Sequence, residues 1–135
     1  MDTCFVIQPF DKDKFDQRFT DIFEPAIEAA GLEAYRVDSD PTVTIPIERI
    51  EEGIKNAKIC FAEITLDNPN VWYELGFAFA SGKDVVMVTE ERQKFPFDIQ
   101  HRHVINYKTT SKSDYEKLEV SIREKLIGLL GKQKS

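Results

Sequence analysis

Short apolar runs alternate along this chain with longer segments in which apolar residues recur every three to four positions. The short runs are typical of strands, and the first, residues 4–7, is apolar throughout, as in a parallel strand covered on both faces. The longer segments have the spacing of helices with one buried side. The pattern predicts strands at 4–7, 33–37, 58–64, 85–88 and 104–107, and helices over 15–30, 47–54, 69–81 and 115–129.

Two prolines refine the predicted helices. Pro25 lies inside the first helical pattern and lacks a backbone N–H, so we expect a kink or a restart near residues 23–24. Asn68 followed by Pro69 is typical of an N-cap and a first helical position, because proline supplies a helical φ where no intrahelical donor is needed.

The order of the elements predicts the fold. Strands and helices alternate almost without exception, which indicates a parallel sheet with right-handed crossovers and helices on both faces. The commonest doubly wound order for five strands is 2-1-3-4-5, so we expect one flavodoxin-like α/β domain over residues 1–135. Ligands then bind at the carboxyl ends of the strands, between the first and the third.

Composition and charge narrow the class of protein. Hydrophobic residues make up 41% and charged residues 31%, as in an ordinary packed domain. The net charge is −6 with Lys and Arg scattered along the chain, so we expect no nucleic-acid partner. The sequence shows no signal peptide and no apolar run of membrane-spanning length, so we expect a cytoplasmic protein without a membrane partner.

Polar residues gather in the loops that follow the first three predicted strands. Because the carboxyl ends of parallel strands meet at one edge of a sheet, we expect these loops to line one binding site. Glu63, late in an otherwise apolar strand, is equally well explained as an anchor for a loop backbone. The candidate binding residues are Gln8, Pro9, Phe10, Asp38, Glu63, Asp67, Asn68, Asn70 and Tyr73.

Glu74 is the strongest candidate for chemistry. It is the only acid in a helical segment, residues 71–80, that is apolar nearly all the way round and that we expect to be a buried central helix. A carboxylate in such surroundings must be paired, protonated or facing a polar cavity. It is therefore either a structural hydrogen-bonding group or a catalytic carboxylate with a pKa tuned by burial and by neighbours such as Asp67. Trp72 and Tyr73 are core residues or stacking partners for a base.

Several familiar signatures are missing from the sequence. There is no GxGxxG or GxxxxGK[ST] loop to hold phosphates, which argues against a nucleoside triphosphatase or a dehydrogenase. His101 and His103 have no matching Cys or His cluster, so we expect no metal site. The sequence indicates no required cofactor.

The run from Asn68 to Ala78, with its Tyr73-Glu74-Leu75-Gly76 segment, resembles the superfamily of nucleoside 2-deoxyribosyltransferases and TIR-like proteins. The likeness includes residues 5–10, the Asp38 loop and residues 81–86, and it spans residues 4–107. It implies that Glu74 acts at the anomeric carbon of a nucleoside, or supports cleavage of NAD at its nicotinamide ribosyl bond. A carboxylate suits an oxocarbenium-like centre, as in retaining glycosidases.

The resemblance favours NAD or a related nucleotide as the substrate. Asn68 stands where the transferases have an aspartate that handles the base, and Trp72 resembles bacterial TIR-like proteins, many of which serve antiviral defence. The leading hypothesis is an enzyme that cleaves or cyclises NAD, in a homo-oligomer as TIR-like enzymes often require. The alternatives are transfer or hydrolysis on a nucleoside or its monophosphate, and a non-catalytic nucleotide-binding sensor or adaptor.

Overall fold

The computed structural model describes residues 1–37, 46–91 and 103–134. Strands and helices alternate as the hydrophobic pattern predicts, with small shifts at their ends. The strands are β1 (Thr3–Ile7), β2 (Glu33–Tyr35), β3 (Ile59–Glu63), β4 (Val85–Glu90) and β5 (Val104–Tyr107). The helices are α1 (Lys14–Arg18), the π-helical turn η1 (Phe19–Phe23), α2 (Glu24–Ala29), α3 (Ile47–Asn56), α4 (Pro69–Ala80) and α5 (Lys112–Gln133).

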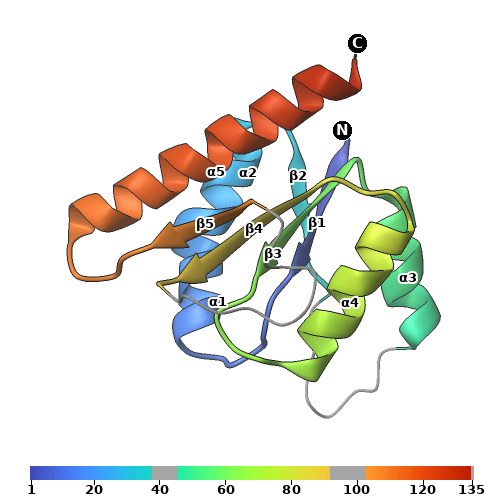
Figure 1. The fold of residues 1–135 in the computed structure, drawn as a ribbon, viewed down its shortest axis with the longest axis horizontal. Coiled ribbons are helices and arrows are strands. Elements are labelled where there is room, and N and C mark those ends of the chain that lie inside the picture. The colour runs from blue at the N-terminus through green and yellow to red at the C-terminus, as the bar shows by residue number, and fades with distance from the viewer. Residues whose placement is uncertain (38–45, 92–102, 135) are drawn as a thin grey trace.

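The five strands form one parallel sheet in the order β2-β1-β3-β4-β5 (Figure 1). The register pairs Phe5 of β1 with Tyr35 of β2 on one side and with Cys60 of β3 on the other. The predicted flavodoxin-like topology is confirmed. The chain leaves β1 toward one edge and leaves β3 toward the other, so the loops after these two strands diverge and open a crevice between them.

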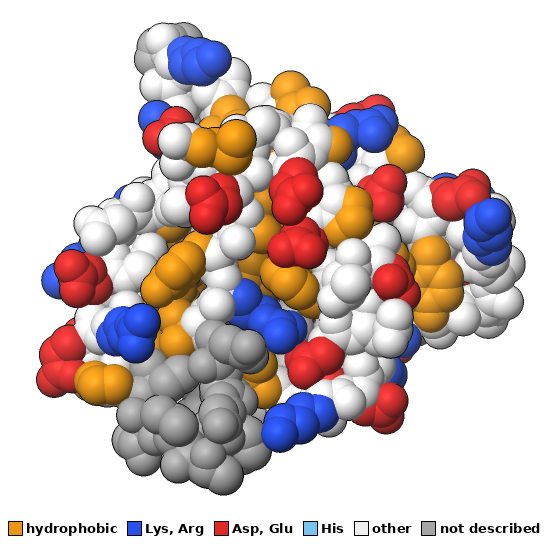
Figure 2. All heavy atoms as spheres, turned by 180° about the vertical axis from the view of Figure 1, so that it is seen from behind, with side chains coloured by type: hydrophobic (Ala, Val, Ile, Leu, Met, Phe, Trp, Pro, Cys, Tyr) orange, Lys and Arg blue, Asp and Glu red, His pale blue; other side chains and the backbone are white. Residues whose placement is uncertain are grey.

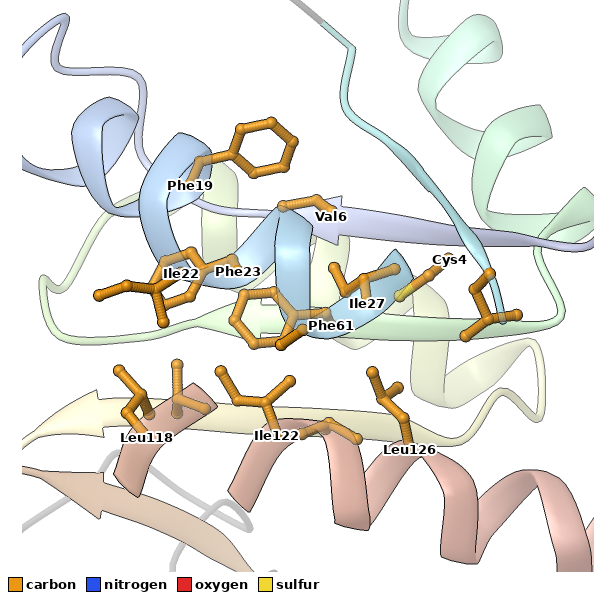
Figure 3. Packing of buried hydrophobic residues seen from close by; sticks show 14 of the residues in the cluster. Cys4, Val6, Phe19, Ile22, Phe23, Ile27, Phe61, Leu118, Ile122 and Leu126 are labelled. Atoms are coloured by element: carbon orange, nitrogen blue, oxygen red, sulfur yellow. The ribbon is translucent and has the colours of Figure 1, made fainter. Parts of the chain in front are cut away.

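Apolar side chains fill both faces of the sheet, and helices cover them. On one face η1, α2 and α5 pack over β1 and β3, where the aromatic rings of Phe23 and Phe61 meet at 4.8 Å between centroids (Figure 3). On the other face α3 and α4 pack over Phe5, Cys60 and Met87. Strands buried on both sides explain why the sequence runs are continuously apolar rather than alternating.

The first helical segment changes its winding before Pro25, as the sequence predicts. The backbone N–H of Glu24 bonds to the carbonyl of Phe19, five residues back, which makes η1 a π-helical turn between α1 and α2. Pro25 has no N–H to continue the ordinary ladder, so the chain restarts as α2 with proline in its first turn. The turn keeps Phe19 and Phe23 on the sheet side, where both are buried.

Helix α4 lies on the outside of the sheet, so the expectation of a buried central helix is wrong. Val71, Leu75 and Ala78 face the sheet and are buried, whereas Tyr73 and Gly76 are exposed. The aromatic residues on its flanks are only partly buried: Lys55 of α3, for example, lies over the ring of Phe77. Glu74 is consequently half-buried at the edge of the molecule rather than enclosed in its centre.

The surface carries both signs of charge. On the face shown in Figure 2, acidic and basic side chains are interspersed over the described residues, with no continuous basic area. Within the described ranges, no helix is both long enough and apolar enough to cross a membrane.

Candidate active site

The main candidate site is a pocket of about 470 Å³ at the carboxyl end of β1, between the starts of α3 and α4. Its size is within the range of small-molecule sites. The switch in strand order places it there, because the loops after β1 and β3 diverge at this edge. It is lined by Phe5, Val6, Gln8, Pro9, Phe10, Val37, Ile47, Ile50, Asn68, Asn70, Tyr73 and Glu74.

Glu74 lies one turn into α4 and contributes the acidic group of the pocket. Among the described residues, no hydrogen-bond or ion-pair partner of its carboxylate is found. Burial raises the pKa of Glu74 from 4.5 to about 7, because low polarity disfavours the charged form. No contribution from Asp67 accompanies this rise, so the expected tuning by that neighbour is wrong. At neutral pH the carboxyl group is therefore poised between its two protonation states.

Asn68 and Asn70 prepare the start of α4. The side-chain oxygen of Asn68 accepts hydrogen bonds from the backbone N–H groups of Asn70 (2.9 Å) and Val71 (3.2 Å), as the predicted N-cap requires. The cap fixes the first turn, and Tyr73 and Glu74 follow in the second turn, where they line the pocket. Asn68 thus has a structural task as well as a place in the lining.

Gln8 follows β1 directly and forms part of the pocket wall, with only 4% of its surface exposed. Its Nε2 donates to the carbonyl of Phe15 at 3.3 Å. Its Oε1 is buried and has no hydrogen-bond partner within the described part of the chain. A buried acceptor without a partner is uncommon in folded proteins.

Exposed aromatic rings stand at the mouth of the pocket. Phe10 is 39% and Tyr73 44% exposed, which excludes the core alternative for Tyr73. The Tyr73 hydroxyl donates to Glu51 of α3, which fixes the ring beside the opening and raises the pKa of Tyr73. Exposed rings of this kind offer flat apolar surfaces on which a planar ligand group can stack.

Arg36 lies near the pocket although the sequence pattern did not single it out as a site residue. It follows β2, its guanidinium lies 5.1 Å from the Phe10 ring centre and 4.6 Å from that of Phe19, and it pairs with Asp16 at 3.1 Å. The available signal is a lone cation directly after a strand, at the edge where ligands bind. Val37, Ile47 and Ile50 were likewise assigned to strand and helix patterns, although they line the pocket.

Glu63 does not line the pocket. It is fully buried at the end of β3, where its carboxylate accepts from the backbone N–H of Thr65 and from the hydroxyl of Tyr107. Arg18 donates to the Tyr107 oxygen at 2.9 Å and pairs with Glu90 at 2.9 Å. Burial raises the pKa of Glu63, and these hydrogen bonds oppose the rise. The arrangement matches the loop-anchor interpretation of Glu63.

The pocket brings together seven of the ten predicted site residues. Asp67 and Glu63 lie outside its lining, and Asp38 lies outside the described residues, as does His101. No group of three or more His, Cys, Asp and Glu side chains within residues 1–37, 46–91 and 103–134 is placed to hold a metal ion. The predicted site residues that do line the pocket are Gln8, Pro9, Phe10, Asn68, Asn70, Tyr73 and Glu74.

Comparison of the sequence with models of known protein families finds no match, and no curated protein matches it either. The fold, in contrast, matches solved structures. A CMP N-glycosidase from Clostridium botulinum superimposes with a TM-score of 0.62 at 22% identity, over 87% of this chain and 98% of that chain. A TIR domain of a Toll-related receptor from Hydra magnipapillata gives 0.62 at 14% identity, over 89% and 97%.

A flavodoxin-like domain from Synechococcus sp. matches as well, with a TM-score of 0.64 at 15% identity, over 95% of this chain and 99% of that chain. Identities this low establish a common architecture. The chain therefore has the flavodoxin-like fold that TIR domains and a nucleotide N-glycosidase also have.

Proposed function

We propose that this protein cleaves the N-glycosidic bond of a nucleotide and that Glu74 is its catalytic carboxylate. The observation that carries the proposal is the state of Glu74: half-buried in the pocket, without a partner among the described residues, and with a pKa raised to about 7. Catalytic acids are typically carboxyl groups that lie in a pocket, have a shifted pKa and are not paired with a cation of the protein.

The chemistry follows from the electron demand of the reaction. As the bond between the anomeric carbon and the base nitrogen breaks, its electron pair leaves with the base and positive charge develops on the ribosyl centre. The ionised Glu74 carboxylate stabilises that charge, or forms a bond to the anomeric carbon that water then breaks. In hydrolysis the water supplies the hydroxyl of the free ribosyl product. Its remaining proton goes to the departing base of a monophosphate, or to solvent when neutral nicotinamide leaves NAD, and the Glu74 carboxylate is regenerated.

The pocket walls suit a nucleotide. Phe10 and Tyr73 flank the opening with exposed rings, and in this proposal they stack on the base or the nicotinamide. Asn70 and Gln8 provide polar contacts for the sugar or the base. Asp38 belongs to the proposed site through the resemblance alone.

NAD or a related nucleotide is the leading substrate, as the resemblance to TIR-like proteins implies, with a role in antiviral defence as its proposed setting. The fold similarity to a CMP N-glycosidase favours a second candidate, a nucleoside 5′-monophosphate. Both substrates present the same kind of bond to Glu74, so they differ in the group that leaves and not in the role of the carboxylate.

Product analysis tests the proposal. Wild-type protein and Glu74→Gln are incubated at high concentration with NAD and with nucleoside monophosphates, and products are separated by chromatography and identified by mass. Glu116→Gln, a change of the same chemistry at an exposed position of α5, is the matched control. We expect release of nicotinamide or free base by wild type and Glu116→Gln, and loss of that release in Glu74→Gln. Saturable binding without any turnover would instead support a sensor or adaptor.

A further inference from the structure

We infer that Gln8 is a specificity-determining residue whose Oε1 accepts a hydrogen bond from a neutral N–H or O–H donor of the bound ligand. The inference rests on the proposed function for the identity of the pocket's ligand as a nucleotide. In this role Gln8 acts toward the ligand only as a hydrogen-bond acceptor, so the part of the pocket next to β1 favours ligands with a donor at that point.

The orientation of the Gln8 amide is fixed by its one partner. A backbone carbonyl can only accept, so the amide nitrogen must face the Phe15 oxygen, to which it donates at 3.3 Å. The amide oxygen then points the other way, as an acceptor only. A flip of the amide would bring two oxygens together and would lose this bond.

The free acceptor is hard to explain by folding alone. Gln8 is 96% buried, and its Oε1 has no partner in the described ranges. The Phe15 carbonyl also accepts a hydrogen bond from the backbone N–H of Phe19, so it would keep a hydrogen-bond partner without Gln8. An apolar side chain of similar length would fill the same space without burying a polar oxygen, which costs stability when left unpaired. What the glutamine adds at this position is an acceptor in the pocket wall.

The chemistry of an acceptor narrows the ligand group that meets it. Phosphate oxygens and base carbonyls are acceptors themselves and are repelled by it. The matching groups of a nucleotide are an amino group or a ring N–H of the base, the carboxamide NH₂ of nicotinamide and a ribose hydroxyl. A site that hydrogen-bonds a ligand donor discriminates strongly against an analogue without it, because the buried protein group is then left unpaired.

Equilibrium binding tests the inference. Dissociation constants are measured by calorimetry for Gln8→Met and for the control Gln17→Met, an exposed glutamine on α1, each in the Glu74→Gln background so that ligands stay intact. The probes are CMP against UMP, NAD against its nicotinic-acid analogue, and CMP against 2′-deoxy-CMP. CMP and UMP differ in the position of the base donor, which is the 4-amino group of CMP and the ring N3–H of UMP. The second pair replaces the nicotinamide NH₂ by a carboxylate oxygen, and the third pair removes a sugar hydroxyl.

We expect the parent protein, which keeps Gln8, to prefer by about tenfold or more the member of one pair that places a donor against Oε1, the change that one hydrogen bond brings. The preference should fall to within twofold in Gln8→Met and persist in Gln17→Met. If Gln8→Met loses the preference within the CMP/UMP or the NAD pair, the donor is on the base or is the carboxamide. If it loses the preference between CMP and 2′-deoxy-CMP, the donor is the sugar hydroxyl. Unchanged preferences in Gln8→Met, or no saturable binding of any probe, would overturn the inference.

Thermal unfolding of the free proteins separates a binding role from a structural one. Because Gln8→Met removes an unpaired buried oxygen, we expect its melting temperature to equal or exceed that of the parent protein. A melting temperature several degrees lower, repeated in Gln8→Leu, would overturn the inference in favour of a structural residue. Turnover is not part of these measurements: hydrolysis with unchanged preferences would refute only the role of Gln8, and Gln8-dependent binding without hydrolysis only the proposed function.

Discussion

Two carboxylates near the carboxyl ends of the strands, the fully buried Glu63 and the half-buried Glu74, have opposite surroundings. Glu63, at the end of β3, accepts from Thr65 and Tyr107 and lies within a network that continues through Arg18 to Glu90. Glu74, on α4, faces the pocket and has no such partner among the described residues. Both have pKa values raised by burial. Burial alone therefore does not identify a catalytic acid. What distinguishes the two carboxylates is whether groups of the protein already hydrogen-bond to them, as for Glu63, or leave them open to a ligand, as for Glu74.

The largest effect should come from Glu74→Gln. The amide keeps the shape of the carboxyl group but cannot stabilise positive charge at the anomeric carbon, so we expect nucleotide cleavage to fall by on the order of 10²–10⁴-fold. Calorimetric titration with the substrate should show binding within a few-fold of wild type. A variant that cleaves at the wild-type rate would remove Glu74 from the mechanism.

The pH dependence should separate the two acids next. If the ionised Glu74 carboxylate is the active form, kcat/KM falls about tenfold per pH unit below pH about 7, where the group becomes protonated. A rate profile from pH 5 to 9 measures this. An inflection that stays near pH 7 in Glu63→Gln and disappears in Glu74→Gln assigns it to Glu74; a flat profile would contradict the assignment.

The same pKa has a consequence for stability. A carboxyl group with a folded-state pKa above its unfolded value of 4.5 favours the folded state when protonated, and this contribution is lost as pH rises through about 7. Well above pH 7 the charged Glu74 thus costs roughly 3 kcal/mol. Urea unfolding at pH 5 and pH 8 should show Glu74→Gln more stable than wild type at pH 8 and close to it at pH 5.

Glu63→Gln should have effects opposite to those of Glu74→Gln: it should lower stability and leave activity unchanged. The amide presents an NH₂ group to the Tyr107 hydroxyl and removes a charge near Arg18, so we expect a loss of roughly 1–3 kcal/mol in the free energy of unfolding. Activity per folded molecule should be retained. Urea unfolding checks the first statement, and a rate corrected for the folded fraction checks the second.

Asn68→Ala should destabilise the start of α4, the helix that carries Glu74, without changing the Glu74 carboxyl group itself. It removes the acceptor for the N–H groups of Asn70 and Val71, which should cost about 1 kcal/mol of stability. Asn68→Asp is the matched control, because its carboxylate oxygen can accept the same backbone N–H groups and so keeps the cap. Equal losses of stability in both variants would show that the cap contributes nothing.

The smallest effect is expected at Gly76, which lies near Glu74 on the exposed side of α4. A Cβ at this position would meet no atom within 4 Å, so close packing on the sheet does not explain the glycine. Gly76→Ala should raise the free energy of unfolding by about 0.5–1 kcal/mol through the helical preference of alanine. At Gly53 the same change brings a Cβ within 2.8 Å of the buried Phe5 ring and should destabilise the protein.

Local patterns were sufficient to predict the fold. Continuous apolar runs identified the strands, Pro25 identified the interruption in the first helical segment, and the Asn68-Pro69 pair identified the start of α4. The side of α4 that meets solvent was not predictable, because its exposed positions include Gly76 and Ala80, whose hydropathy resembles that of core residues. Cover for Phe77 comes from Lys55 on another helix, which no periodicity reveals.

The candidate site was predictable in location and less so in detail. Its edge of the sheet followed from the strand order, and Glu74 followed from one acid in an apolar segment. The difference between Glu63 and Glu74 was not visible, because the partner that satisfies Glu63 is Tyr107, 44 residues along the chain. Arg36 was missed for a similar reason: its contacts with Phe10 and Asp16 form only after the strands are paired.

The most direct test of the account is a side-by-side measurement of the initial rate of nicotinamide or base release by wild type, Glu74→Gln and Glu63→Gln, each divided by its folded fraction. We predict that release is lost only in Glu74→Gln, whereas Glu63→Gln retains the wild-type rate per folded molecule. Continued release by Glu74→Gln, or an equal loss in both variants, would contradict the claim that the unpaired carboxylate of the pocket performs the cleavage.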